Sequence, residues 1–196
     1  MTDVWEQLAR YRKVKTLPSG ARLLLRPLTR EDKQGFVDLF ARAAERDLEL
    51  FRSDAGDPAV VESWVDTLNL ERVFPLIAIV DEGDPKGRTI VGDATLHFGE
   101  HYRRHRAWVR IFLDDNYRRQ GIGTLMLRTL IEIARRVGRH QLYAEVLTTQ
   151  PQVIKAFGDL GFRPEITLSD YFMMNNGETL DMTILALQLV DHSGEF

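Results

Sequence analysis

The stretch from Ala107 to Gly138 constrains the fold of this chain more than any other. It begins with a short apolar run, Ala107 to Leu113, whose β-branched and aromatic residues predict a buried strand. Turn-forming residues follow at 114–116, and from Gly121 the apolar spacing becomes that of an amphipathic helix, which Gly138 closes. The predicted apolar face of this helix comprises Ile122, Met126, Leu130, Ile133 and Val137. The stretch therefore predicts a strand, a turn and a long helix.

The junction between this strand and helix is predicted to bind an anion. It consists of Arg118, Arg119, Gln120, Gly121, Ile122, Gly123 and Thr124. Gly121 and Gly123 let backbone N–H groups point inward without an obstructing Cβ, and the start of the helix adds positive partial charge. A phosphate or pyrophosphate suits such a site. The junction lacks the lysine of a P-loop and the third glycine of a dinucleotide-binding turn, since Met126 stands there.

Composition indicates one globular domain over residues 1–196, with residues 1–13 as an N-terminal extension. The chain is 44% hydrophobic and 28% charged, and a net charge of −3 provides no general attraction to nucleic acid or membranes. We therefore expect neither as a partner. The absence of cysteine excludes disulfides and thiol catalysis and is compatible with a cytoplasmic location.

The remaining chain reads as alternating strands and short helices. A hairpin over residues 14–28 precedes a helix that Thr29 caps, an acid-rich segment covers residues 45–57, and Pro58 opens another helix. Apolar runs at 74–80, 89–98 and 107–113 predict an antiparallel meander, with a loop at 81–87 and Gly92 at a bulge. The strand at 140–147 should run parallel to 107–113 because a helix connects them. A short helix after Pro151 and a hairpin around residues 175–177 complete the order.

The pattern R-x-x-G-x-G, filled by Arg118, Gly121 and Gly123, resembles the acyl-CoA-binding motif of the GNAT superfamily of N-acetyltransferases. Residues 150–162 resemble the second signature of that family, N-x-x-A-x-x-x-Y-x-x-x-G-F. Its Gly-Phe end matches, whereas Gln150, Val153 and Phe157 stand at the Asn, Ala and Tyr positions. The resemblance extends over about residues 21 to 190.

The resemblance implies an α/β fold with a mixed, mostly antiparallel sheet of about 6–7 strands, a central parallel pair and about four helices. It also implies acetyl-CoA as the co-substrate. Residues 118–124 would hold the pyrophosphate, and the main chain of Ile111, Phe112 and Leu113 would hold the pantetheine arm, which Gln150 and Phe157 would also contact. The N–H group near Leu113 would face the thioester oxygen as an oxyanion donor.

The resemblance further implies that an amine attacks the thioester directly, so some group must accept a proton. Glu145 is the candidate base, since some branches of the family carry a glutamate five residues before the Asn position. Strand alternation places it on one face with Tyr143. A salt-bridged strand carboxylate is the alternative role for Glu145. Phe157 cannot donate a proton to the leaving thiolate, so water, Tyr143 or Tyr171 would supply it.

The leading hypothesis is an acyl-CoA-dependent N-acyltransferase acting on a small-molecule amine, a protein lysine or an N-terminus. A non-catalytic CoA-sensing module and an O-acyltransferase are alternatives. The acidic segment would favour a cationic amine or simply be a solvated loop. His101 and His105 have helical metal-ligand spacing but lie among arginines, so we expect no metal and instead a solvated turn or a contact to the CoA 3′-phosphate. The sequence does not decide the oligomeric state, and a homodimer is one option because the last hairpin could supply a sheet edge.

Overall fold

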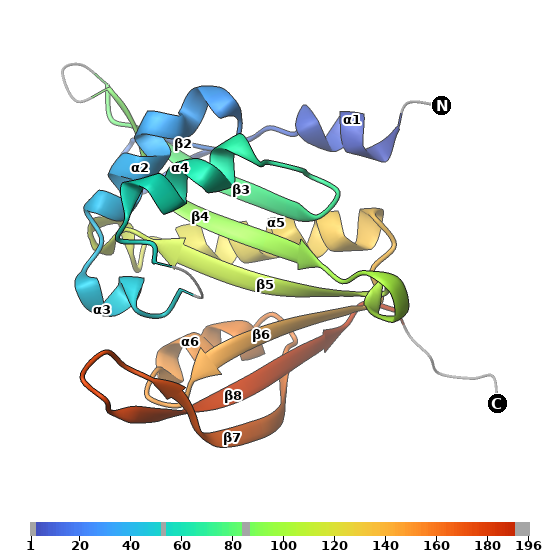
Figure 1. Ribbon diagram of the computed structural model, residues 1–196. Coiled ribbons are helices and arrows are strands. Elements are labelled where there is room, and N and C mark those ends of the chain that lie inside the picture. The colour runs from blue at the N-terminus through green and yellow to red at the C-terminus, as the bar shows by residue number, and fades with distance from the viewer. Residues whose placement is uncertain (1–2, 52–53, 84–86, 191–196) are drawn as a thin grey trace. The chain divides into compact units, whose positions relative to one another are not determined.

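A computed structural model describes residues 3–51, 54–83 and 87–190. Its eight strands form a sheet in the order β1-β2-β3-β4-β5-β6-β8-β7 (Figure 1). The strands are β1 (Lys13–Thr16), β2 (Arg22–Pro27), β3 (Val73–Asp81), β4 (Arg88–Phe98), β5 (Arg106–Leu113), β6 (Gln141–Leu147), β7 (Arg163–Met173) and β8 (Thr179–Gln188). The α-helices are α1 (Val4–Ala9), α2 (Lys33–Ala41), α3 (Glu45–Leu48), α4 (Pro58–Asp66), α5 (Ile122–Arg136) and α6 (Pro151–Gly158).

The predicted mixed, mostly antiparallel sheet and its parallel β5–β6 pair are confirmed, while the element counts were slightly low. Eight strands form the sheet instead of about 6–7, and the four-residue β1, the first strand of the expected hairpin, is the edge strand paired with β2. The described residues contain six α-helices instead of about four, the shortest being α1 and α3. Arg52 of the acid-rich segment and residues 84–86 of the expected loop lie outside the described residues.

Packing divides the chain into two units. The first comprises Met1–Thr95 and Ile111–Leu127, and the second comprises Leu96–Arg110 and Arg128–Phe196. The strands β4 and β5 and the helix α5 each run through both units. The boundaries between the two units therefore fall inside these three elements and not in loops.

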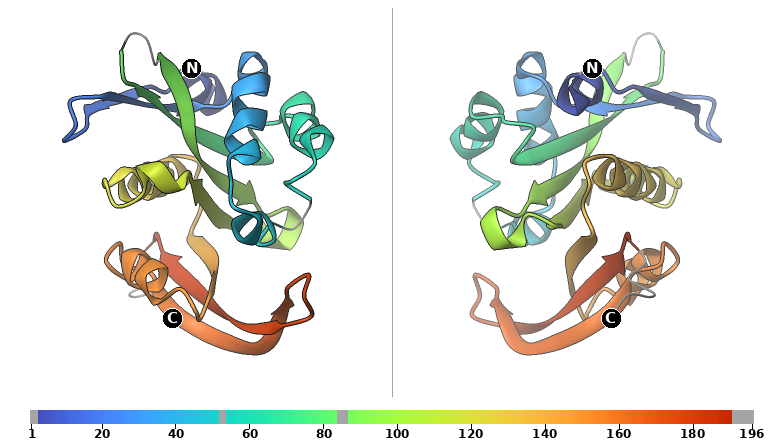
Figure 2. Two further views of the ribbon diagram at one scale, coloured as in Figure 1. Left: turned by 90° about the vertical axis from the view of Figure 1, so that its left-hand side faces the viewer. Right: turned by 90° about the vertical axis from the view of Figure 1, so that its right-hand side faces the viewer.

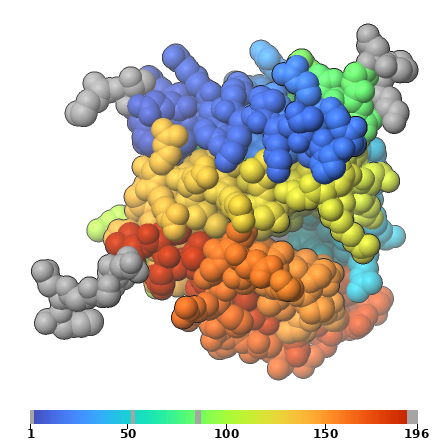
Figure 3. Space-filling model, turned by 180° about the vertical axis from the view of Figure 1, so that it is seen from behind, coloured from blue at the N-terminus to red at the C-terminus, as the bar shows by residue number. Residues whose placement is uncertain are grey.

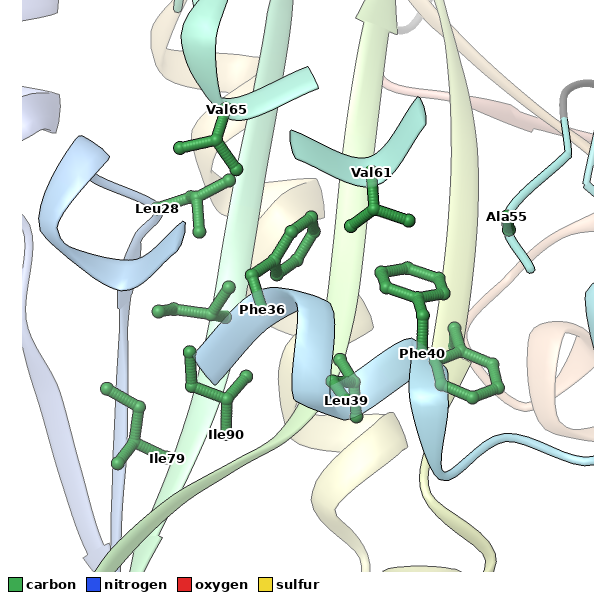
Figure 4. Packing of buried hydrophobic residues seen from close by; sticks show 11 residues of the cluster. Leu28, Phe36, Leu39, Phe40, Ala55, Val61, Val65, Ile79 and Ile90 are labelled. Carbon is green, nitrogen blue, oxygen red and sulfur yellow. The ribbon is translucent and has the colours of Figure 1, made fainter. Parts of the chain in front are cut away.

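The core of the first unit is an aromatic cluster under α2 and α4, which lie together on one face of β3 and β4 (Figures 1 and 4). The ring of Phe40 lies edge-on to Phe36 at a centroid distance of 5.2 Å and stacks on Phe112 at 5.4 Å. The ring of Trp64 from α4 also meets Phe40 edge-on, at 5.5 Å. Since Phe112 points into this core, alternation directs its strand neighbours Ile111 and Leu113 to the opposite face.

Gly92 allows β4 and β5 to approach closely. A Cβ at this position would lie 2.8 Å from Leu113 Cδ1 and 3.1 Å from the Phe112 carbonyl oxygen, so a larger residue would require Leu113 to move and would crowd the backbone of β5. Such a Cβ would also face Met126 of α5, whereas Ile90 packs in the α2 and α4 core. Residues two apart in a regular strand share a face, so the strand is irregular between positions 90 and 92. This is where the sequence places a bulge.

The helix α5 has the predicted amphipathic character. Its buried residues are Ile122, Met126, Leu127, Thr129, Leu130, Ile131, Ile133 and Ala134. Its other side carries exposed Arg128, Glu132 and Arg135, and appears as the yellow band in Figure 3. Gly138 closes the helix in the left-handed conformation, with a φ of 70°.

The second unit is built on β6, β8 and β7. The strand β8 pairs antiparallel with β6 over seven residue pairs and with β7 along the final hairpin. Shifts in register interrupt the β7–β8 pairing after Pro164 and after Leu168, and Figure 2 shows this hairpin bending along its length. The predicted tight turn is present, with a φ of 85° at Gly177.

Asp32 joins the end of β2 to the start of α2. Its carboxylate accepts two hydrogen bonds from Arg26, of 2.6 and 2.5 Å, and one each from the backbone and hydroxyl of Thr29, of 2.8 and 2.7 Å. Burial raises the pKa of Asp32, but the hydrogen bonds from Arg26 and Thr29 outweigh it and hold the pKa below its usual value. The predicted cap at Thr29 is therefore part of a larger network.

We expect Asp32→Asn to lower the free energy of unfolding by about 1–2 kcal/mol at pH 7, because Arg26 loses its charged partner and the hydrogen bonds from Thr29 no longer end on a charged oxygen. The folded-state pKa is depressed, so this stabilisation is present above the unfolded pKa near 3.9 and is lost as pH falls through the folded pKa. Urea unfolding of both proteins at pH 7 and pH 3 measures this. Asp38→Asn, at an exposed site on α2, is the control and should change stability by less than about 0.5 kcal/mol. An undiminished difference at pH 3 would contradict the assignment.

Candidate functional site

The turn before α5 is anchored by Asp114, whose side chain is buried, with an exposed fraction of 6%. It accepts hydrogen bonds from the backbone N–H of Asn116 at 3.0 Å and from Arg42 Nε at 3.2 Å. The N–H of Asp114 in turn donates to the Val91 carbonyl at 2.9 Å. The end of β5 and the start of the turn are therefore fixed to β4 and α2.

The turn ends in a conformation that exposes backbone N–H groups. Arg119 and Gly121 have left-handed φ values of 61° and 77°. The first helical hydrogen bond runs from the N–H of Leu125 to the Gly121 carbonyl at 3.1 Å. The N–H groups of residues 122–124 therefore lie in the first turn of α5, where no helical carbonyl reaches them. Three such donors at a helix start can bind an anion.

Gly123 is not required by the packing of the chain itself. A Cβ there would lie 3.5 Å from Ile111 Cδ1, an ordinary van der Waals contact, and its φ is not in the left-handed region. In a helix, glycine is less stable than alanine by about 0.5–1 kcal/mol. A glycine that costs stability and fills no steric need indicates close approach of something outside the chain.

The side chain of Arg118 is bound to groups of the chain. Its guanidinium donates from Nε to the Leu113 carbonyl at 2.9 Å and pairs with Asp47 at 2.5 Å and with Asp115 at 2.6 Å. Asp47 lies on α3, in the acid-rich segment. The positive charge of Arg118 is thus balanced by two carboxylates, which leaves the backbone N–H groups of the turn as its main anion-binding feature.

Residues 111–113, which the sequence predicts to hold the pantetheine arm, lie beyond the part of β5 that pairs with β6. The parallel ladder between β5 and β6 comprises four pairs, from Arg106↔Gln141 to Val109↔Ala144. Residues 111–113 continue β5 beyond this ladder. In the described part of the chain, their main-chain groups on that edge take no part in the β6 ladder.

Glu145 lies on β6 in the second unit. Along this strand Leu142, Ala144 and Val146 are buried, while Tyr143 and Glu145 are partly exposed, as alternation predicts. The position of Glu145 in the sheet is fixed by pairing with Ile184 of β8.

Gln150 and Phe157 mark the two ends of α6, also in the second unit. Gln150 is the N-cap residue, and its backbone N–H donates to the Leu147 carbonyl at 2.9 Å. Phe157 is 2% exposed and its ring lies edge-on to Phe162 at 5.0 Å. The structure thus groups residues 111–113 with 118–124 in one unit, and Glu145 with Gln150 and Phe157 in the other.

Sequence reasoning did not single out Asp93, which is 1% exposed on β4. A single acidic residue leaves the apolar pattern of a strand intact, so periodicity gives no warning. The cost of burying a carboxylate in an apolar strand, which pointed to Glu145, could have identified Asp93 as well.

Two absences hold for the residues that the structure describes. Those residues contain no group of three or more His, Cys, Asp or Glu side chains placed to hold a metal ion. Likewise, no described helix is both long and apolar enough to span a membrane.

Comparisons with known proteins agree with this geometry. An L-methionine sulfoximine/L-methionine sulfone acetyltransferase from Salmonella typhimurium is 25% identical over 120 residues, which cover 61% of this chain and 68% of the relative. The fold is similar to that of a ribosomal-protein-alanine N-acetyltransferase from Brucella melitensis, with a TM-score of 0.70, 23% identity, and coverage of 84% of this chain and 98% of that chain. It is also similar to a phosphinothricin acetyltransferase from Sinorhizobium meliloti solved in complex with acetyl-CoA, with a TM-score of 0.72, 18% identity, and coverage of 86% and 89%.

The model of the acetyltransferase (GNAT) family matches residues 38–162, from within α2 through the turn before α5 to Phe162, which lies between α6 and β7. The match includes both segments on which the resemblance was based. The chain therefore belongs to the acetyltransferase (GNAT) family.

Proposed function

We propose that this protein is an acetyl-CoA-dependent N-acyltransferase that transfers the acetyl group to a primary amine in a ternary complex. The observation that carries the proposal is the turn before α5, where the left-handed Gly121 and the sterically unneeded Gly123 leave three helical N–H groups open. The pyrophosphate of CoA is the anion that fits a member of this family.

The donor site would continue along the end of β5. The main chain of Ile111, Phe112 and Leu113 would hold the pantetheine arm, because these residues lie beyond the β6 ladder. The N–H near Leu113 would stabilise the oxyanion that forms when the amine adds to the thioester carbon. The tetrahedral intermediate then collapses, the C–S bond breaks, and the CoA thiolate leaves.

Glu145 would accept the proton of the attacking amine, directly or through water. Phe157 offers no proton, and a thiol has a pKa of about 8.5, so the CoA thiolate can leave near neutral pH with little assistance. The hydroxyl of Tyr143 donates to Gln141 at 3.0 Å, whereas Tyr171 on β7 is 55% exposed. Water or Tyr171 would then protonate the thiolate.

The test is to measure acetyl-CoA binding by calorimetry and release of free thiol with a panel of amines. We expect binding together with turnover of at least one primary amine. Tight CoA binding with no turnover across a broad panel would favour the sensing module, and the buried Phe157 is the feature that supports this second candidate. Turnover with alcohols alone would indicate O-acyl transfer, while a chain that ignores CoA would refute the proposal.

A further inference from the structure

A hollow lies in the second unit, next to the C-terminal end of α5, the end away from Gly121 and Gly123. Its volume is about 460 Å³. It is lined by Tyr102, Arg104, His105, Gly138, Arg139 and His140. This described lining contains two arginines and two histidines but no carboxylate. We call it the basic pocket.

The wall of the basic pocket is a tight turn that concentrates positive charge. The N–H of Gly99 donates to the Arg106 carbonyl at 3.0 Å, and a Cβ on Gly99 would lie 2.2 Å from the Arg103 carbonyl oxygen. The turn therefore requires glycine at this position. It carries Arg103, Arg104 and Arg106 against one carboxylate, Glu100, so the net charge of the turn is positive.

Arg139 is the second arginine of the lining. One of its terminal nitrogens donates to the Arg104 carbonyl, and its guanidinium lies over the Phe98 ring, 4.7 Å from the centroid. Its Nε is buried and has no acceptor among the described residues. This buried Nε is closed to a ligand, so Arg139 would offer the other nitrogens of its guanidinium to an anion in the hollow.

The two histidines of the basic pocket lie close to each other and to these arginines. The backbone N–H of His140 donates to the His105 carbonyl at 2.7 Å, and the centroids of the two imidazole rings lie 6.1 Å apart. Arg106 Nε donates to His105 Nε2 at 3.0 Å, so that nitrogen carries no proton. Partial burial and the charges of Arg106, His140 and Arg104 lower the pKa of His105, against a smaller opposing effect from a hydrogen bond with the Tyr102 backbone. A bound anion would reverse the effect of these charges.

We propose that the basic pocket binds a phosphate or phosphate ester. Guanidinium groups bind phosphate oxygens in fixed, often bidentate geometry, and Arg104 and Arg139 bring two of them to one hollow. Tyr102, 76% exposed and with Arg103 5.2 Å from its ring centroid, adds a flat face on which a nucleobase can stack. This site is separate from the proposed donor site and does not depend on it.

The test follows the imidazole resonances of His105 and His140 by NMR during titration with pyrophosphate, ribose 5-phosphate and AMP at constant ionic strength. We expect saturable shifts and a rise in the pKa of His105 when the anion is bound. Arg139→Gln and, should that variant fail to fold, Arg104→Gln should weaken binding about tenfold. Arg163→Gln, which removes an exposed arginine from β7 in the same unit, should leave the affinity unchanged.

The arms of the titration separate the sources of phosphate. Binding of AMP more tightly than ribose 5-phosphate, with the difference lost in Tyr102→Ala, would identify a nucleotide, and equal binding would identify the phosphate group alone. The proposal is overturned by the absence of imidazole shifts or by an equal loss of affinity in Arg163→Gln. It is also overturned if the arginine variants only lower the melting temperature. Failure of the chain to bind CoA would refute the proposed function and leave this site untouched.

Discussion

Glu145→Gln is expected to lower kcat for amine acetylation by about 10²- to 10⁴-fold, the usual contribution of a general base. An acceptor amine with a pKa near 10.4 is mostly protonated at neutral pH, and an amide side chain cannot take its proton. The affinity for acetyl-CoA should remain essentially unchanged, because the proposed donor contacts are main-chain groups of β5 and α5. Thiol release gives kcat, and calorimetry gives the dissociation constant.

Glu165→Gln is the matched control, since Glu165 is exposed on β7 in the same unit, and it should keep full activity. Raising the pH should partly rescue the Glu145 variant, because more of the amine is then already deprotonated. Unchanged kcat in the Glu145 variant would contradict the assignment. Loss of turnover in Asp93→Asn instead would move the base to β4.

Gly123→Ala should weaken acetyl-CoA binding by about tenfold to a hundredfold, the value of one hydrogen bond to a charged group. The added methyl group meets only Ile111 Cδ1 at 3.5 Å, so the chain accommodates it. It would obstruct the approach of a pyrophosphate to the open N–H groups of residues 122–124. The free energy of unfolding should rise by about 0.5–1 kcal/mol, because alanine favours the helix.

Gly158→Ala in α6 is the control for this substitution. A Cβ there would meet no atom within 4 Å, so this variant gains the same helix stability without an effect on binding. Calorimetry and urea unfolding of both variants separate the two properties. Full acetyl-CoA affinity in the Gly123 variant would show that the turn before α5 is not the pyrophosphate site. A loss of affinity that accompanies unfolding would show only a structural role.

Local sequence patterns predicted the elements that carry the turn. The apolar run before Leu113, the helical spacing from Ile122 and the left-handed glycine at 138 each depend on neighbours within one element, and the structure has all three. The parallel β5–β6 pair followed from the handedness and length of the connection, since a helix separates the strands.

Local patterns could not predict contacts between residues that are distant in the sequence. Arg118 lies 71 residues from Asp47, and nothing in the spacing of either residue announces their ion pair. Gly92 was expected at a bulge, but its closeness to Phe112 and Leu113 depends on how two strands pack together. The residues proposed to act in chemistry stay predictions until the variants above are measured.

The network around Asp32 has a consequence for how this part of the molecule opens. One carboxylate holds a strand residue, Arg26, and both the backbone and hydroxyl of the helix cap, Thr29. Fraying of the first helical turn would break these hydrogen bonds and leave Arg26 without its partner, so we expect it to weaken the strand end as well. We therefore expect the backbone amides of the two segments to exchange with solvent at similar rates, as parts of one cooperative unit.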